Sequence, residues 1–353
     1  MSSHSPTPAR NWKALLVRHE LLLLYVLLAE WVFFYFRGTT TNFSGHTVGF
    51  GTAGAQVDIL RHSCEIGLLA LVMTPVILTG GIDLSVGSLM GLSAVVFGKL
   101  WRDAGVPAPA AMAATLAFGA LAGGLNATLI TWLRLPPLIV TLGTFSLFRG
   151  LAEAITRGAD TFTGFPAPFQ ALGQGNWLGL PVQLLVFVAV AVAVWLLVHR
   201  TTFGRSFRAI GYAPEGARYA GLPVQRRLAL VYVLAGTGAA LAGLIFTARL
   251  NQAGANTGTG YELFAITAVV LGGTSIFGGS GSVHGTLLGW AAVAVLGDSL
   301  PYVDWPREVG GMLTGVLLIV ALSASVLPKL LPAWRARRQS APSPNPQPSP
   351  SSP

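Results

Sequence analysis

The stretch TGGIDLSVGS, at residues 79–88, lies between two apolar segments. A second stretch, LGGTSIFGGSGS at residues 271–282, repeats the order of apolar segment, Gly-Gly, a few residues, Gly-Ser and apolar segment. In lipid, a broken helix is tolerated only where protein or a water-filled cavity satisfies the freed backbone groups, and paired breaks indicate a transport path. The alternative is two tight helix–turn–helix connections at the cytoplasmic face. Asp83 favours a path for the first stretch, because an acidic group among apolar residues is costly at membrane depth.

The composition around these stretches is that of a membrane protein. The chain is 52% hydrophobic and 10% charged, which leaves too few polar residues for the surface of a soluble protein. A bilayer crossing takes about 20 apolar residues of helix. We therefore predict an all-α, polytopic membrane helix bundle of about ten transmembrane helices, or eight with two re-entrant segments. The ten apolar segments are 19–36, 60–80, 85–101, 108–133, 137–155, 181–198, 226–249, 262–276, 283–300 and 308–327.

The basic residues indicate an orientation, since Lys and Arg accumulate in short cytoplasmic loops. With the N-terminus inside, 14 of the 22 Lys and Arg residues fall on the inner side, and six of these lie in loop 199–227. Both termini are therefore expected in the cytoplasm. We expect an N-terminal cytoplasmic tail at 1–18, a transmembrane domain at 19–328, and a cytoplasmic, disordered Pro/Ser-rich tail at 329–353, where few apolar groups offset the entropy of ordering.

Several classes of function are excluded. A net charge of +9 on so apolar a chain reflects membrane topology, and no nucleic-acid module is visible. The single cysteine, Cys64, excludes an internal disulfide, and the six histidines lack metal-ligand spacing. The sequence contains neither a phosphate-binding loop nor a His, Cys or carboxylate cluster of catalytic spacing in its spans. We expect a protein that is not an enzyme and that binds no cofactor and no metal.

Small residues mark two helix faces that suit close packing. Gly119 and Gly123 form a GxxxG pair, and Ala235, Ala239 and Gly243 follow one another at four-residue spacing. Lipid gives helices no hydrophobic reason to associate, so small residues that let backbones approach are typical of helix contacts in membranes. These faces predict helix–helix packing and carry no functional signal.

Three motifs together carry a resemblance. They are GGIDLSVGS at 80–88, PLIVTLGT at 137–144, and LGGTS with FGG and GS within 271–282. Their order and spacing resemble those of the membrane permeases of bacterial ABC sugar importers, in the ribose, xylose, rhamnose and autoinducer-2 branch. Residues 149–165, which end in FTGF, are most similar to the rhamnose and autoinducer-2 members.

The resemblance implies the partners and the location. Such permeases form a pore of two permease subunits, identical or homologous, in the bacterial inner membrane. ABC ATPase subunits on separate chains hydrolyse ATP, and a periplasmic sugar-binding protein delivers the sugar. This chain would then carry out no chemistry of its own, and its partners would be proteins and the lipid bilayer.

The same resemblance implies a role for the basic loop 199–227. Its segment PEGARYAG, at 214–221, is similar to the Glu-Ala-Ala-Arg-x-x-Gly segment that such permeases press into a groove on the ATPase. Gly216 departs from the usual Ala, which predicts a shorter helix because glycine costs about 1 kcal/mol in a helix interior. Gly221 suits a left-handed helix cap. The alternative is an ordinary basic loop held inside by its charge. The residues predicted to couple to the ATPase are Arg205, Arg208, Glu215, Ala217, Arg218 and Gly221.

A sugar path is expected to offer hydroxyl and amide groups near the broken helices. The residues predicted to form the path are Gly80, Gly81, Asp83, Ser85, Ser88, Asn126, Thr141, Thr144, Gly272 and Gly273. The competing hypothesis is an ion-coupled secondary transporter of a small polar solute, for which Asp83, Glu153 and Asp298 are the candidate ion sites. Against it, Arg149 lies four residues before Glu153, so these two are expected to pair.

Overall fold

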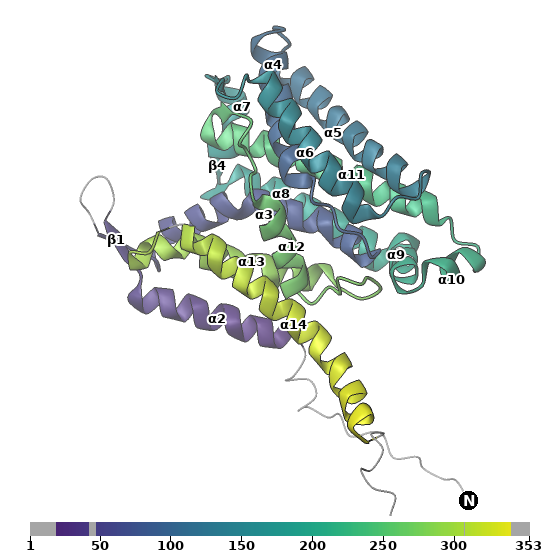
Figure 1. The fold of residues 1–353 in the computed structure, drawn as a ribbon. Helices are drawn as coiled ribbons and strands as arrows, with labels where there is room; N and C mark the ends of the chain where they lie inside the picture. Colours follow the sequence, from purple (N-terminus) through teal and green to yellow (C-terminus); the bar gives the residue numbers. More distant parts are fainter. Residues whose placement is uncertain (1–18, 42–46, 307, 340–353) are drawn as a thin grey trace, which may run out of the picture.

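The computed structural model describes residues 19–41, 47–306 and 308–339 of the chain, and the expected N-terminal tail at 1–18 lies outside this part (Figure 1). The helices are α2 (His19–Arg37), α3 (Ala53–Leu78), α4 (Val86–Arg102), α5 (Ala108–Thr131), α6 (Pro137–Ile155), α7 (Ala167–Gln174), α8 (Val182–Trp195), α9 (Thr202–Tyr212), α10 (Pro214–Tyr219), α11 (Val224–Leu250), α12 (Tyr261–Leu271), α13 (Val283–Ser299) and α14 (Glu308–Gln339). A π-helical turn, η1 (Leu196–Arg200), extends α8, and a 3-10 turn, η2 (Leu300–Val303), extends α13.

Each of the ten predicted apolar segments overlaps a different helix, so the all-α bundle is confirmed. Among the described residues, six helices are long and apolar enough to cross a membrane, namely α3, α5, α6, α8 with η1, α11, and α13 with η2. Helix α12 and residues Glu308–Ser323 of α14 are apolar but shorter. The predicted count of about ten crossings is therefore not confirmed.

Helix α14 is longer than the sequence suggested. It continues to Gln339, so residues 329–339 of the tail expected to be disordered are helical in the structure. The extension consists largely of Leu, Ala and Arg, which are good helix formers. The remainder of that tail, 340–353, lies outside the described residues.

Helix α11 is the centre of one half of the bundle and packs against α3, α4 and α5. The predicted glycine faces make these contacts. A side-chain carbon at Gly119 would lie 2.6 Å from the carbonyl oxygen of Gly236 on α11, and one at Gly123 would lie 2.3 Å from that of Tyr232. Gly243 brings α11 equally close to α4, at 2.5 Å from the carbonyl oxygen of Met90. The expected close packing is confirmed.

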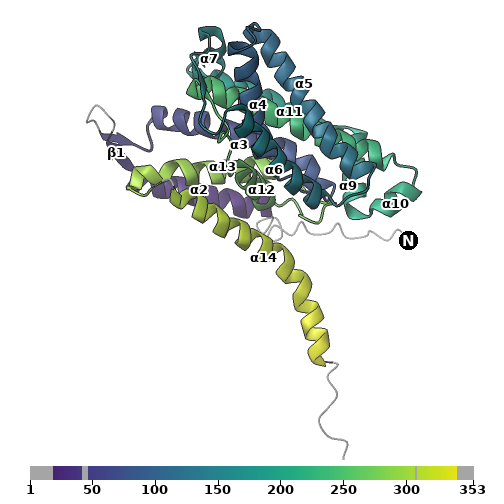
Figure 2. The ribbon, with the colours of Figure 1, turned by 45° about the horizontal axis from the view of Figure 1, so that its top comes forward.

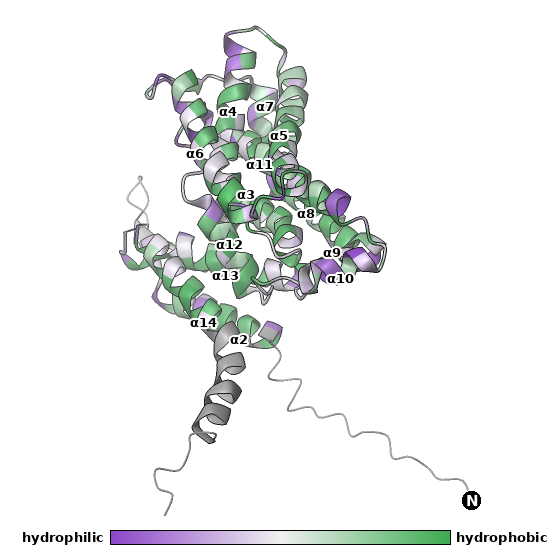
Figure 3. Ribbon diagram, turned by 45° about the vertical axis from the view of Figure 1, so that its right-hand side comes forward, coloured by the Kyte–Doolittle hydropathy of each residue, from purple (hydrophilic) through white to green (hydrophobic). Residues whose placement is uncertain are grey.

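The helices form two groups joined by α3. Helices α4, α5, α6 and α11 lie on one side, and α2, α13 and α14 lie together on the other (Figures 1 and 2). Helix α3 packs against α11 as well as against α12 and α13. The helices are mainly hydrophobic along their length, whereas hydrophilic residues gather at α10 and at the opposite tips (Figure 3).

Short strands tie the connections between helices. Strands β1 (Thr39–Thr41) and β2 (Thr47–Gly49) form one hairpin, and β4 (Asn176–Trp177) and β5 (Leu180–Pro181) form another. Strand β3 (Phe162–Thr163), which follows α6, pairs antiparallel with β6 (Gln252–Ala253), which follows α11. This last pair joins the far ends of α6 and α11.

Candidate functional site

The two glycine-rich breaks contact each other. The first separates α3 from α4 and the second separates α12 from α13. The backbone N–H of Gly279, in the second break, donates a hydrogen bond of 2.9 Å to the carbonyl of Leu78, at the end of α3. Two segments almost two hundred residues apart in sequence, residues 79–85 and 272–282, therefore form one structural unit.

Helix α9 also packs against this unit. A side-chain carbon at Gly211 would lie 2.1 Å from the carbonyl oxygen of Leu78 and 2.4 Å from the nitrogen of Gly279. Gly278 has a φ of +83°, and a side-chain carbon there would lie 2.7 Å from the nitrogen of Gly80. Only glycine fits such backbone-to-backbone contacts. Both breaks are thus helix connections at the end of the bundle that carries α9.

Asp83 is buried in the first break and belongs to a chain of hydrogen bonds. Its Oδ1 accepts 2.9 Å from the backbone N–H of Ser85 and 2.6 Å from the Ser85 hydroxyl. That hydroxyl in turn accepts 2.9 Å from the side-chain amide of Asn126, on α5. The three predicted residues therefore meet, and they join the break to α5.

The other predicted hydroxyl groups are also committed to the protein. Thr141, on α6, donates 3.0 Å to the carbonyl of Ile82 and so holds the first break from a second side. Ser88 and Thr144 each donate to a carbonyl one turn earlier in the chain, at 2.9 and 3.1 Å. All of these hydroxyl-bearing side chains are buried. In this conformation all three hydroxyls are used within the protein, and Thr141 holds the first break to α6.

The second break is held by glycine contacts of its own. A side-chain carbon at Gly272 would lie 2.4 Å from the carbonyl carbon and oxygen of Gly285, on α13. Gly273 has a φ of +85°, which is unfavourable for any residue with a side chain. The hydroxyls of Thr74 and Thr286 lie 2.8 Å apart beside this contact and connect α3 with α13.

One residue of this region was missed in the sequence. The Tyr232 hydroxyl, on α11, is buried and has no hydrogen-bond partner among the described residues. It faces Gly81, where a side-chain carbon would lie 2.4 Å from that hydroxyl oxygen. The side-chain oxygen of Asn126 is likewise unpartnered within the described part of the chain. Tyr232 stands in an apolar helical run and carries no sequence signal.

Helix α10 presents the central residues of the predicted coupling segment to the outside. Glu215 and Arg218 are exposed and form an ion pair of 3.1 Å across one turn. Ala217 points inward and packs with Ile210 and Val224 in a small buried cluster. The helix therefore has one apolar side that anchors it and one polar side that is open.

Gly221 caps this helix as predicted. It has a φ of +81°, its N–H donates 3.0 Å to the carbonyl of Arg218, and the N–H of Leu222 donates 3.0 Å to that of Ala217. This pair of bonds is the Schellman arrangement, in which a left-handed residue satisfies the last carbonyls of a helix. The predicted left-handed cap is confirmed.

The two basic residues of α9 differ in their surroundings. Arg205 is exposed. Arg208 instead donates 3.1 Å to the carbonyl of Val198 and 3.4 Å to that of Gly281, in the second break. Arg208 therefore connects α9 to the second break and is directed away from the exposed surface of α10.

A cavity of about 450 Å³ separates α10 from the first break. Pro214, Glu215 and Arg218 line one side of it. Gly80 and Gly81 line another, together with Tyr232. Of the predicted path residues, only these two glycines line this cavity. The outer surface of α10 and the first break thus share one space.

Comparison with known proteins identifies the family of the chain. Residues 56–322 match the family model described as the permease component of branched-chain amino acid transport systems. Autoinducer 2 import system permease proteins LsrD from Escherichia coli O9:H4 (strain HS), E. coli (strain K12) and Shigella flexneri are each 39% identical over 285 residues, which is 78% of this chain and 86% of theirs. No solved structure matches.

The chain belongs to this permease family. The permease is accordingly a multi-pass inner membrane protein and a component of an ABC transport system, in a family of transport components and not of catalytic subunits. The matched residues include both breaks, α9 and α10. The permease contains no group of three metal-ligating side chains within the residues that the structure describes.

Proposed function

We propose that this permease is the membrane-spanning subunit of an ATP-driven importer that carries a simple sugar, with an autoinducer-2-like sugar as the first candidate. The observation that carries this proposal is the 39% identity over 285 residues to permeases of autoinducer 2 import systems. Two permease subunits, identical or homologous, would form the pore. A periplasmic binding protein would deliver the sugar, and ATPase subunits on other chains would supply the energy.

Helix α10 is the proposed contact with the ATPase. Its exposed ion pair, Glu215 with Arg218, offers both charges to a partner, and the guanidinium can bind a carboxylate in a two-pronged geometry that Lys cannot reproduce. The buried side of α10 and its glycine cap hold this surface in a fixed position.

The proposed route of coupling runs through α9. At Gly211 this helix contacts backbone atoms of Leu78, at the end of α3 just before the first break, and of Gly279 in the second break, and Arg208 adds a hydrogen bond to the second break. Side-chain rotation cannot absorb a displacement between backbones in direct contact, because packed interiors are not continuously deformable. A movement that the ATPase imposes on α10 would therefore shift the connections that precede α4 and α13.

A pair of matched glycine substitutions tests the coupling role. Gly221 and Gly179 both have a φ of +81°, and a side chain at either would have open space around it. Gly221 caps α10, whereas Gly179 lies in the β4–β5 hairpin at the other end of the bundle. Gly221→Val should abolish sugar uptake and reduce co-purification of the ATPase. Gly179→Val carries the same backbone strain and should leave both intact.

Glu215→Lys tests the charge without backbone strain, since the side chain is exposed. It should also abolish uptake, while sugar-loaded binding protein still docks on the permease. Full substrate-stimulated ATP hydrolysis with normal uptake in both Gly221→Val and Glu215→Lys would show that α9 and α10 form only a charged loop that fixes topology.

The proposed orientation places both termini in the cytoplasm. In a Cys64→Ala background, Gln174→Cys should react with an impermeant thiol reagent in intact cells, and Gln339→Cys should react only after the cells are opened. Reaction of Gln339→Cys from outside would reverse the orientation or change the number of crossings to an odd one.

A further inference from the structure

A second cavity, of about 290 Å³, lies at the end of the bundle opposite α10. Helix α6 begins beside the α10 cavity at Pro137 and ends next to Thr156, which lines the second cavity. Helix α11 likewise begins at one cavity and ends at the other. Its 27 residues span about 40 Å at about 1.5 Å per residue. The two cavities therefore lie at opposite ends of the same two helices.

The frame of the second cavity is held firmly. Strands β3 and β6 pair at its edge, and the loop after β6 is fixed by Arg149 of α6. This guanidinium donates to the carbonyl of Ala255 and, at 3.3 Å, to that of Thr257. Asn251, with a φ of +52°, accepts 2.9 Å from the N–H of Phe165 and closes the turn between α11 and β6. The cavity is thus preformed.

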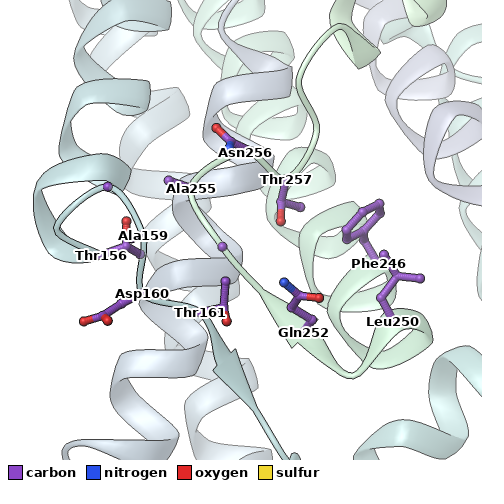
Figure 4. Close-up of a pocket in the computed structure, with 12 residues that line it drawn as sticks. Thr156, Ala159, Asp160, Thr161, Phe246, Leu250, Gln252, Ala255, Asn256 and Thr257 are labelled. Carbon is purple, nitrogen blue, oxygen red and sulfur yellow. The ribbon is translucent and has the colours of Figure 1, made fainter. Parts of the chain in front are cut away.

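Most polar side chains that line the second cavity, unlike those around Asp83, form no hydrogen bond to the described part of the protein. Thr156 donates 2.9 Å to a carbonyl of α6, but the other polar side chains of the lining form no hydrogen bond to any residue that the structure describes. These uncommitted residues are Asp160, Thr161, Gln252, Asn256 and Thr257. Figure 4 shows Gln252 and Thr257 between the ring of Phe246 on one side and Thr156, Ala159 and Asp160 on the other. Donors and acceptors from two separate connections therefore meet around one space.

The chemistry of this lining selects a class of ligand. Amide and hydroxyl groups both donate and accept, a carboxylate accepts from two neighbouring hydroxyls, and an aromatic ring offers a flat apolar surface. Among the described residues that line the cavity there is no Lys or Arg to receive a carboxylate or phosphate. A neutral molecule with several hydroxyl groups on a small apolar frame satisfies all of these groups. The lining itself would offer the carboxylate of an amino acid no cation and would place Asp160 beside it.

We propose that this second cavity is an entry site of the permease that binds the polyhydroxylated substrate before it crosses the bundle. The proposal rests on the proposed function and specifies it further. The site lies at the end opposite the proposed ATPase contact, where a binding protein would release its sugar. Asp160 and Asn256 are exposed at its rim, and Phe246 is partly buried deeper in the lining.

Protection of an introduced thiol tests the site on the permease alone. In a Cys64→Ala background, the purified full chain in lipid nanodiscs carries Asn256→Cys, and the rate of its reaction with a maleimide is measured with and without autoinducer-2, D-ribose or L-rhamnose. A ligand present at about four times its dissociation constant slows the reaction about fivefold, because only the empty site reacts. We expect this slowing for at least one of the three sugars.

The controls are chosen at the same end of the molecule. Ala104→Cys is exposed between α4 and α5 and does not line the cavity, so its reaction rate should not change with sugar. L-Leucine should not slow the reaction at Asn256→Cys, because the lining has no cation for its carboxylate. Thr161→Cys, on the other wall, provides a second reporter if Asn256→Cys folds poorly.

Three results would overturn the proposal. One is an unchanged reaction rate at both reporter positions with every sugar, and another is protection by L-leucine. The third is protection by the binding protein without sugar, which would make the cavity a docking surface. Failure of the proposed function is distinguishable, since it would appear as absent uptake of all three sugars in cells that contain the complete importer, whatever the labelling shows.

Discussion

The polar side chains at the two ends of α6 and α11 differ in how they are hydrogen-bonded. At the α10 end, the side chains of Asp83, Ser85 and Asn126 are hydrogen-bonded to one another, and glycines bring backbones into direct contact. At the β3–β6 end, the side chains of Gln252 and Asn256 have no described partner and border a cavity. The first end is built to hold connections together, and the second is built to leave groups available.

In our proposals this difference separates coupling to the ATPase, at the first end, from ligand binding, at the second. Buried polar groups that are fully paired rigidify a structure, whereas groups around a cavity remain free to bind a solute. The glycine-rich breaks are the most specific motifs of the sequence. In this conformation they form a tight backbone contact with α9, made by Leu78, Gly80, Gly211, Gly278 and Gly279, which we call the joint. The proposed sugar contacts lie instead around the second cavity, where one wall comes from residues 149–165, the stretch most similar to the rhamnose and autoinducer-2 members.

The largest effect is expected from filling the joint. Gly211→Val places a side chain 2.1 Å from a backbone oxygen that cannot move without displacing α3. We expect a loss of more than about 5 kcal/mol in unfolding free energy, and hence no folded permease in the membrane. Gly216→Ala is the control, because a side-chain carbon there has its nearest neighbour at 3.4 Å. Normal amounts of folded Gly211→Val permease in detergent extracts would show that the backbone contact at Gly211 is not needed for folding.

The next effect concerns the buried ion pair at the β3–β6 end. Arg249 of α11 donates 2.8 Å to Glu65 of α3, which is fully buried. Glu65→Ala leaves a buried cation without its partner and should destabilise the permease by about 3–5 kcal/mol in thermal or denaturant unfolding. Asp103→Ala is the control. The hydrogen bond from Arg102 lowers the pKa of the Asp103 carboxyl, but both side chains are partly exposed. Water can therefore solvate Arg102 when Asp103 is removed, so little stability should be lost. Equal unfolding midpoints for the two variants would show that the Arg249–Glu65 ion pair does not stabilise this end of the bundle.

A smaller effect is expected at Asp83. Asp83→Asn keeps an acceptor for Ser85 but brings an amide N–H₂ donor into a buried site that offers it no established partner, a loss of about 1–2 kcal/mol. Membrane insertion should be normal, while uptake in vesicles at equal protein level should fall several-fold because the first break is held less firmly. Asp304→Asn, in an exposed left-handed turn at the other end, should behave as wild type. Unchanged uptake in Asp83→Asn would deprive this carboxylate of a functional role.

The smallest effect on stability, and the sharpest contrast with the joint, is expected from Gln252→Ala. Its amide has no described partner, so the unfolding free energy should not change measurably. The sugar concentration for half-maximal uptake should rise several-fold with an unchanged maximal rate, because a ground-state contact is lost. A lowered maximal rate with an unchanged half-saturating sugar concentration would show that Gln252 acts in the conformational change and does not contribute to sugar binding.

The local features were predictable from the sequence because their causes are local. Hydropathy over 20 residues located every long helix, and Gly-Gly and Gly-Ser pairs located both breaks. Gly221 was assigned to a left-handed cap because glycine adopts that conformation without steric cost. The permease family followed from motif order for the same reason, since each motif is continuous in the chain.

Partners across the bundle could only come from the tertiary structure. Arg149 was expected to pair with Glu153 one turn away, but it donates to the carbonyls of Ala255 and Thr257. Helical spacing offered the nearer charge, whereas folding brought two backbone acceptors closer. The length of α14 was also underestimated, because apolarity marks where a helix can be buried and does not mark where it ends.

The sequence by itself determined that this chain is a helical membrane permease, where its helices break, and which glycine caps α10. Only the tertiary structure decided that Gly211 lies against the end of α3 and the second break, that Tyr232 lies against Gly81, and that the ends of α6 and α11 border a cavity with polar side chains in its lining. The physical reason is distance along the chain. Hydropathy and glycine content act within about a turn or a span, whereas a site is made of side chains that approach only after helices far apart in sequence have packed.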